Sequence, residues 1–149
     1  MPKPPAPDSR LNLKPADWLA WFDGSCKPNP GDCQIACILQ GPDGQRITHT
    51  QAAGHGDSSD AEYQALILCL QLAQRHVAPS QSLRIHGDSQ VVIDDVLARY
   101  GKTSALLAHY RERCLQLLSA LANTQTACDL QWIPRHKNIE ADQLMRAQS

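Results

Sequence analysis

Residues 18–53 read WLAWFDGSCKPNPGDCQIACILQGPDGQRITHTQAA, and this stretch decides the fold class. The apolar, aromatic-rich run at 18–22 predicts a buried strand that ends before an Asp-Gly-Ser turn. A second strand is expected at 33–40 and a third at 45–53, joined by a turn of glycine, proline and aspartate at 41–44. Three successive strands with short connections predict an antiparallel meander.

Beyond this stretch the apolar positions take the three- and four-residue spacing of helices. A helix from about Asp60 to His76 is expected to start with a Ser-x-x-Glu capping box, from Ser59 to Glu62. The elements expected after it are a strand at 83–86, a helix at 91–100, a longer helix with apolar residues from Leu106 to Leu121 on one face, a strand at 130–133, and a helix capped by Asn138 and ending near Ala147. The order β-β-β-α-β-α-α-β-α predicts an α/β fold, a mixed five-stranded sheet with helices on its faces.

Composition limits the possible classes of protein. The chain has 149 residues, with 14 Lys and Arg against 15 Asp and Glu, and this near-zero net charge excludes binding of nucleic acid through bulk positive charge. Prolines at 2, 4, 5 and 7 predict a disordered lead-in at 1–16, followed by a single domain at 17–149. The sequence contains neither a secretory signal nor a run of roughly 20 apolar residues. We therefore expect a cytoplasmic protein that does not bind a membrane. No protein partner is implied, and a monomer is expected.

The cysteines give no sign of a metal site. All six lie outside CxxC pairs and mostly inside apolar runs, at positions 26, 33, 37, 69, 114 and 128. Buried free thiols in a reducing cytosol are the favoured interpretation, because a zinc site needs tighter ligand spacing.

Four acidic residues fall where ligand sites collect in open α/β sheets, mostly at strand ends beside helix starts. Asp23 and Asp88 follow predicted strands, Glu62 lies in the first turn of a helix, and Asp142 in the second turn of the last helix. Four carboxylates in one pocket would repel one another, and divalent cations are the simplest remedy. Ligands that are all oxygen favour Mg²⁺ or Mn²⁺.

Each of these acids also has an ordinary structural interpretation, as a turn residue, a helix cap or a solvated helix residue. Asp94 and Asp95 are expected to be solvated helix residues of that kind.

Four segments together resemble the signature blocks of the ribonuclease HI family. They are DGSCKPNPG at 23–31, DAEYQAL at 60–66, HGDSQ at 86–90 and NIEAD at 138–142. Their order, and their places on strand, helix, strand and helix, also match the family. Each block alone is weak, but four in order are specific, and the resemblance runs from about Trp18 to Met145.

The resemblance implies an endonuclease that cuts the RNA strand of RNA–DNA hybrids with two Mg²⁺ or Mn²⁺ ions, leaving 5′-phosphate and 3′-hydroxyl ends. Carried over by position, Asp23 would bridge both ions, and Glu62 and Asp88 would hold the ion near the leaving oxygen. Asp142 would help to hold the ion that activates water. The residues that match substrate-contacting positions are Cys26, Asn29, Ser58, Ser59, Gln90 and Asn138.

His136 has two open interpretations. In many relatives a histidine on a flexible loop before the last helix assists proton transfer or product release, and a residue with a pKa near 6.5 suits that role. His136 lies in a shorter loop and closer to Asn138 than that histidine usually does, so an exposed loop residue is the alternative. The other histidines, at 49, 55, 76, 86 and 109, are expected to be structural or exposed.

The chain departs from the family at two places. Only four residues separate Gly101 from Leu106, where many relatives carry a basic protrusion that grips the hybrid. Asp57 stands where relatives often have a threonine that contacts a DNA phosphate. Local basic residues that could compensate are Lys27, Lys102, Arg135 and Lys137.

These departures make weak, salt-dependent binding the expectation. They keep two alternatives open. One is another metal-dependent nuclease on the same fold, such as a 3′ exonuclease or a single-strand RNase. The other is a nucleic-acid-binding module without catalysis.

Overall fold

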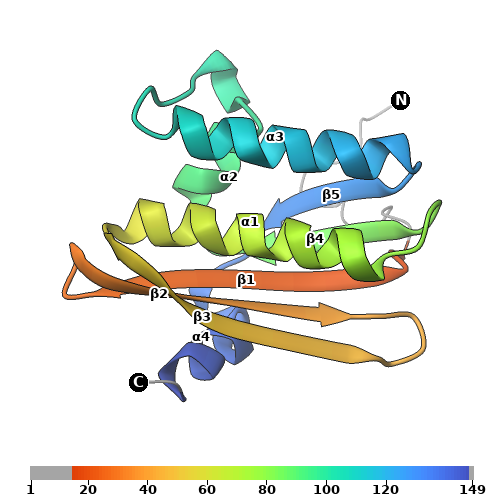
Figure 1. Cartoon of the computed structure of the whole chain (residues 1–149), viewed down its shortest axis with the longest axis horizontal. Helices are drawn as coiled ribbons and strands as arrows, with labels where there is room; N and C mark the ends of the chain where they lie inside the picture. The colour runs from red at the N-terminus through yellow and green to blue at the C-terminus, as the bar shows by residue number, and fades with distance from the viewer. Residues whose placement is uncertain (1–14, 148–149) are drawn as a thin grey trace, which may run out of the picture.

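The computed structural model describes residues 15–147, and its centre is one mixed five-stranded sheet (Figure 1). The strands are β1 (Trp18–Lys27), β2 (Gly31–Gln40), β3 (Arg46–Gly56), β4 (Ser82–Gly87) and β5 (Ala127–Trp132). Their order across the sheet is β3-β2-β1-β4-β5, in which β1, β2 and β3 are antiparallel while β1, β4 and β5 are parallel. The predicted meander and the predicted mixed α/β sheet are confirmed.

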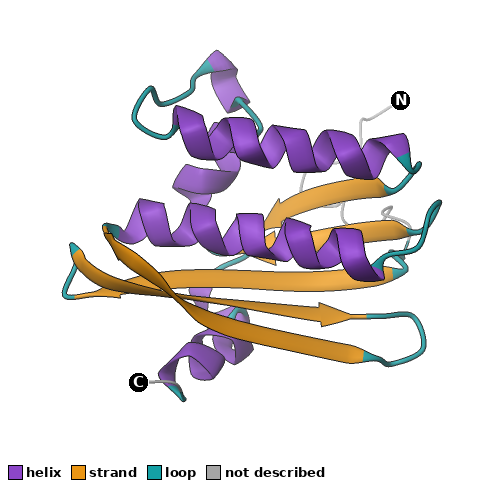
Figure 2. Cartoon of the chain, viewed as in Figure 1, coloured by secondary structure: helices purple, strands orange, loops and turns teal. Residues whose placement is uncertain are grey.

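Helices cover both faces of this sheet (Figure 2). They are α1 (Ser58–His76), α2 (Gln90–Val96), α3 (Ala108–Asn123) and α4 (Ile139–Arg146), with short 3₁₀ turns η2 (Arg99–Gly101) and η3 (Arg135–Lys137). The long helix α1 packs on β1 and β2 and also against α3, while α4 packs on the opposite face of β1 and β2. Because α1 covers the middle of the sheet, its buried side chains and those of β1 and β4 form the main core.

Three predicted boundaries were wrong. The strand expected to end at residue 22 continues to Lys27, because residues 23–27 pair in register with β2. The helix expected at 91–100 breaks after Val96, since Ala98 and Tyr100 adopt positive φ angles of 50° and 60°. The next helix starts at Ala108, which leaves the side chain of Leu106 87% exposed outside it.

The capping box of α1 also differs from the prediction. It is formed by Asp57 and Asp60, not by Ser59 and Glu62: the Asp60 amide donates to Asp57 Oδ1 at 3.0 Å, and the Asp57 amide donates to Asp60 Oδ2 at 2.8 Å. The carboxylate of Asp57 therefore caps the helix, which gives this acid a structural role. The carboxylate of Glu62 is left free to bond elsewhere.

The prediction of free thiols was wrong for two cysteines. Cys26 of β1 and Cys33 of β2 are directly opposite in the antiparallel register, so both side chains lie on the same face, and they form a disulfide. The prediction is confirmed for the free cysteines, which are Cys37, Cys69, Cys114 and the half-buried Cys128. Two of the six cysteines are therefore oxidised, and the expectation of a reducing cytosol now depends on the other four alone.

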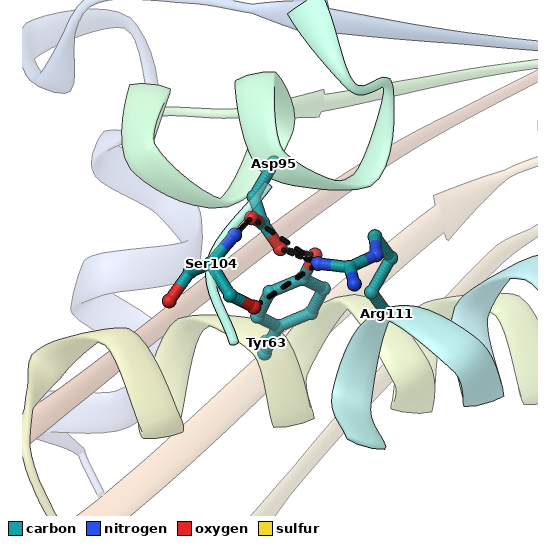
Figure 3. Close-up of polar contacts among 4 residues, drawn as sticks. All are labelled: Tyr63, Asp95, Ser104 and Arg111. Atoms are coloured by element: carbon teal, nitrogen blue, oxygen red, sulfur yellow. Dashed lines mark hydrogen bonds and ion pairs between the residues drawn. The ribbon is translucent and has the colours of Figure 1, made fainter. Parts of the chain in front are cut away.

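The prediction that Asp95 is solvated was also wrong. Its side chain is only 6% exposed and accepts hydrogen bonds from Tyr63, Ser104 and Arg111 (Figure 3). Asp94, the neighbouring acid, is half-buried and pairs with Arg99 at 3.2 Å.

The predicted lead-in lies almost wholly outside the described residues. The 1–16 lead-in and the single domain at 17–149 accordingly stay predictions. Within residues 15–147, no helix is long and apolar enough to cross a bilayer.

Candidate active site

Three acidic side chains from three different elements meet at one edge of the sheet. Asp23 lies in β1, Glu62 in the first turns of α1, and Asp88 directly after β4. Each offers an oxygen, and these oxygens all lie within 4.8 Å of one another. Because β1 and β4 are parallel neighbours in which Phe22 pairs with Gly87, the two aspartates that follow emerge side by side.

Glycine at position 24 lets the third acid reach the other two. The Gly24 amide donates to Glu62 Oε1 at 2.6 Å and to Asp23 Oδ1 at 3.0 Å. A Cβ at this position would lie 2.4 Å from the backbone carbon and oxygen of Ala61, closer than atoms can approach. The absence of a side chain therefore permits α1 to lie against β1 and brings Glu62 into the cluster.

The cluster is electrostatically unfavourable without a cation. Burial, followed by repulsion from Asp88, raises the pKa of Asp23 to about 7. Burial also raises the pKa of Glu62 well above its usual value, and the charges of Asp23 and Asp88 add to this effect. A hard divalent cation relieves this repulsion, and a set of oxygen ligands is the donor set that Mg²⁺ and Mn²⁺ prefer.

Two neighbouring side chains hold Asp88 in position. The side-chain nitrogen Nδ2 of Asn138 donates to Asp88 Oδ2 at 3.0 Å and to the backbone oxygen of Phe22 at 2.9 Å. The indole of Trp132 donates to the backbone oxygen of Asp88 at 3.1 Å. Asn138 is 2% exposed and is the N-cap residue of α4, as predicted. Its side chain makes no capping hydrogen bond and instead links α4 to β1 and Asp88.

Asp142 lies beside the cluster rather than inside it. Its charge contributes to the raised pKa of Asp23, which places it near that residue. Its carboxylate is half-buried and pairs with Arg146 at 3.0 Å, and it is not part of the group of oxygens within 4.8 Å. The structure therefore joins three of the four predicted ligands and places the fourth next to them.

A groove of about 410 Å³ runs along Glu62 and Asp88. It collects five of the predicted substrate-contacting residues, which are Cys26, Asn29, Ser58, Ser59 and Gln90. The Ser58 amide donates to Asn29 Oδ1 at 3.0 Å, so the β1–β2 turn and the start of α1 form one wall.

The groove has further lining residues that sequence analysis missed. They are Gly24, Ser25, Ser89 and Val91. Arg135, one of the basic residues expected to compensate for the missing protrusion, also lines the groove. Ser25 and Ser89 follow the two aspartates closely in sequence, and Val91 is an apolar residue left 60% exposed. Proximity to the predicted ligands was the signal that could have identified them.

The histidines contribute little to this groove. His136 lies exposed in η3 and does not line the groove, whereas its neighbour Arg135 does. His86 is structural, as expected: its ring stacks on Trp21 with centroids 5.2 Å apart, and its Nδ1 lies 2.9 Å from the backbone oxygen of Ala20.

Comparison with known proteins agrees with this geometry. The family model described as reverse transcriptase-like matches residues 21–148. The chain is 29% identical over 126 residues to the ribonuclease HI of Halobacterium salinarum, a match that covers 84% of this chain and 60% of that relative.

Solved structures show the same architecture. The crystal structure of RNase H1 from Halobacterium salinarum superposes with a TM-score of 0.74 at 27% identity, covering 87% of this chain and 94% of that one. The structure of LC11-RNase H1 in complex with an RNA/DNA hybrid gives a TM-score of 0.76 at 20% identity, with 87% and 94% coverage. The chain therefore belongs to the reverse transcriptase-like family, and its fold is that of the ribonuclease H structures.

Proposed function

We propose that this protein is a metal-dependent ribonuclease H that cuts the RNA strand of RNA–DNA hybrids internally. The observation that carries the proposal is the convergence of Asp23, Glu62 and Asp88 beside a groove lined by the predicted substrate-contacting residues. The name of the halobacterial relative and the hybrid bound to LC11-RNase H1 support the choice of substrate.

The residues fit a pair of divalent ions. Asp23 would bridge the two, Glu62 and Asp88 would hold the first, and Asp142 would complete the second after its carboxylate leaves Arg146. Such a pair of Mg²⁺ or Mn²⁺ ions would supply stabilisation of the entering and leaving oxygens of an in-line displacement, which would leave 5′-phosphate and 3′-hydroxyl ends.

The protein's own side chains would orient the substrate and the ligands. Asn138 and Trp132 hold Asp88 in place, so its carboxylate need not be organised when the substrate binds. The hydroxyl and amide groups of Ser58, Ser59 and Gln90 suit contacts with ribose hydroxyls and base edges in the minor groove of a hybrid. Arg135 is the cation that lines the groove and would meet a phosphate. A proton-transfer role for His136 remains a prediction.

Substrate affinity should be low. The net charge is −1, and only residues 102–107 separate η2 from α3, so no basic protrusion lies there. Binding then depends on few phosphate contacts and on the ions. The monomeric state and the cytoplasmic location stay part of the proposal.

A substrate panel tests the proposal. Labelled hybrid, single-stranded RNA, duplex RNA and duplex DNA are each incubated with Mg²⁺, with Mn²⁺ and with EDTA. We expect internal cuts in the RNA of the hybrid alone, abolished by EDTA. Cleavage that proceeds only from a 3′ end, or that prefers single-stranded RNA, would favour another nuclease on this fold. Metal-independent hybrid binding without cleavage would favour a binding module.

Asp88→Asn provides the site-specific arm of this experiment. Loss of an outer-shell partner of a metal costs roughly 10–100-fold in activity, so removing a ligand charge should lower cleavage by more than about 100-fold. Asp94→Asn is the matched control, since Asp94 lies on α2 and pairs with Arg99 outside the cluster. Equal activity of the Asp88 variant and the wild type would refute the assignment.

A further inference from the structure

A buried carboxylate that is not part of the acidic cluster joins three helices. Asp95 of α2 accepts a hydrogen bond from the Tyr63 hydroxyl of α1 at 2.6 Å and from the Ser104 amide at 2.6 Å (Figure 3). Arg111 of α3 donates to the same carboxylate at 3.3 Å and to the backbone oxygen of Ser104 at 3.2 Å. The Asp95 side chain is only 6% exposed, and its burial is tolerated because both carboxylate oxygens accept hydrogen bonds.

This network connects α1, which carries Glu62, to α2, which follows Asp88. Tyr63 follows Glu62 in α1, so the bond from its hydroxyl fixes the turn that carries that ligand. Asp95 belongs to the helix that starts two residues after Asp88, with Ser89 as its N-cap. The bond between Tyr63 and Asp95 therefore ties the element that presents one ligand to the element that follows another.

The helix α2 needs such an anchor. It has seven residues, well below the roughly 12–15 that an isolated helix requires in water, so its position depends on tertiary contacts. The oxygens of Asp23, Glu62 and Asp88 also lie within 4.8 Å of one another, so these carboxylates repel when they are charged. Ligands that repel one another must be held by bonds made elsewhere.

We propose that Asp95 and Tyr63 form a positioning pair that holds Glu62 and Asp88 at the spacing needed to bind one divalent ion. Arg111 pairs with Asp95 at 3.3 Å, and the Ser104 amide holds the short segment before α3 against the same carboxylate. This inference rests on the proposed metal site. It assigns to the pair metal affinity rather than a chemical step.

The chain supplies a matched control for the test. Tyr110 stacks on Tyr63 with ring centroids 5.5 Å apart, and its hydroxyl also donates to a carboxylate, that of Asp60 at 3.0 Å. Tyr63→Phe and Tyr110→Phe each delete one such hydroxyl and keep the ring. Only the first deletion breaks the link to α2.

Mn²⁺ affinity is measured by calorimetry for the wild type and both variants of the full chain, together with hydrogen exchange of the α2 amides and thermal unfolding. We expect Tyr63→Phe to weaken Mn²⁺ binding about tenfold, which corresponds to the loss of roughly 1.4 kcal/mol. Its α2 amides should exchange faster, and saturating Mn²⁺ should restore its cleavage rate. Tyr110→Phe should bind Mn²⁺ within about twofold of the wild type.

The outcomes separate this inference from the proposed function. A wild type that binds no Mn²⁺ refutes the metal site and the inference with it. A wild type that binds Mn²⁺, with unchanged affinity in Tyr63→Phe, refutes only the positioning role. An equal loss of affinity in both variants also refutes it, because the cause is then general destabilisation.

Discussion

Asp23→Asn should stabilise the metal-free protein at neutral and alkaline pH. The native state raises the pKa of this carboxyl from 3.8 to about 7, chiefly by burial and then by repulsion from Asp88. Its neutral form is therefore favoured by folding and its charged form is penalised. A shift of about 3 units, at 1.36 kcal/mol per unit, gives a penalty on the order of 4 kcal/mol. The side chain is only 7% exposed, so solvent screens little of this effect.

The direction of the pH dependence follows from linkage. Below the unfolded pKa of 3.8 the carboxyl is protonated in both states and contributes no penalty. The penalty grows as the pH rises from about 4 to about 7, because the unfolded chain releases the proton first, and it is complete above pH 7. Asparagine never ionises, so the variant should match the wild type near pH 4 and exceed it at pH 8.

Thermal unfolding in EDTA at pH 4, 6 and 8, followed by tryptophan fluorescence, measures the difference. The full penalty corresponds to a difference in Tm of roughly 8–16 °C at pH 8 for a domain of this size. Mg²⁺ should narrow this difference, because binding at 100 times Kd stabilises the wild type by about 2.7 kcal/mol and the variant by less. A variant that is less stable than the wild type at pH 8 in EDTA, or a difference that does not change with pH, would refute the reasoning.

Two other substitutions test the geometry around the cluster. Gly24→Ala should cost about 3 kcal/mol or more in the free energy of unfolding, since its Cβ would lie 2.4 Å from the Ala61 backbone; stability and Mn²⁺ affinity equal to the wild type would contradict the close approach. Thiol labelling of the denatured, unreduced protein should detect four free cysteines, and six after reduction. In Cys33→Ala, Cys26 should also be labelled without reduction. Six reactive thiols in the unreduced wild type would contradict the disulfide.

The periodicity of the sequence was sufficient to predict the sheet and most of the helices. Alternation and turn residues at 41–44 place the hairpin of β2 and β3, and the apolar spacing from Ala61 to Leu72 places α1. Both signals are local, so a single sequence contains them. The places of Glu62 in the first turns of a helix and of Asp88 directly after a strand were also expected, whereas Asp23 lies within β1 rather than after it.

The features that the sequence analysis missed depend on contacts between distant residues. The pairing of Cys26 with Cys33 depends on the strand register, and the burial of Asp95 depends on Tyr63 and Arg111, 32 and 16 residues away. The cap of α1 was misassigned because serine and aspartate at neighbouring positions both suit an N-cap, and only the backbone decides between them. Asn138 does occupy the N-cap position of α4, but its side chain donates to Asp88 instead of capping the helix.

A crystal of the protein soaked in Mn²⁺ and measured at the manganese absorption edge would place the bound ions directly. If the proposed metal site is correct, we expect one anomalous peak within bonding distance of carboxylate oxygens from Asp23, Glu62 and Asp88. With a hybrid bound, a second peak should lie between Asp23 and Asp142. Density that shows these three side chains free of manganese at millimolar Mn²⁺, or turned away from one another, would contradict it.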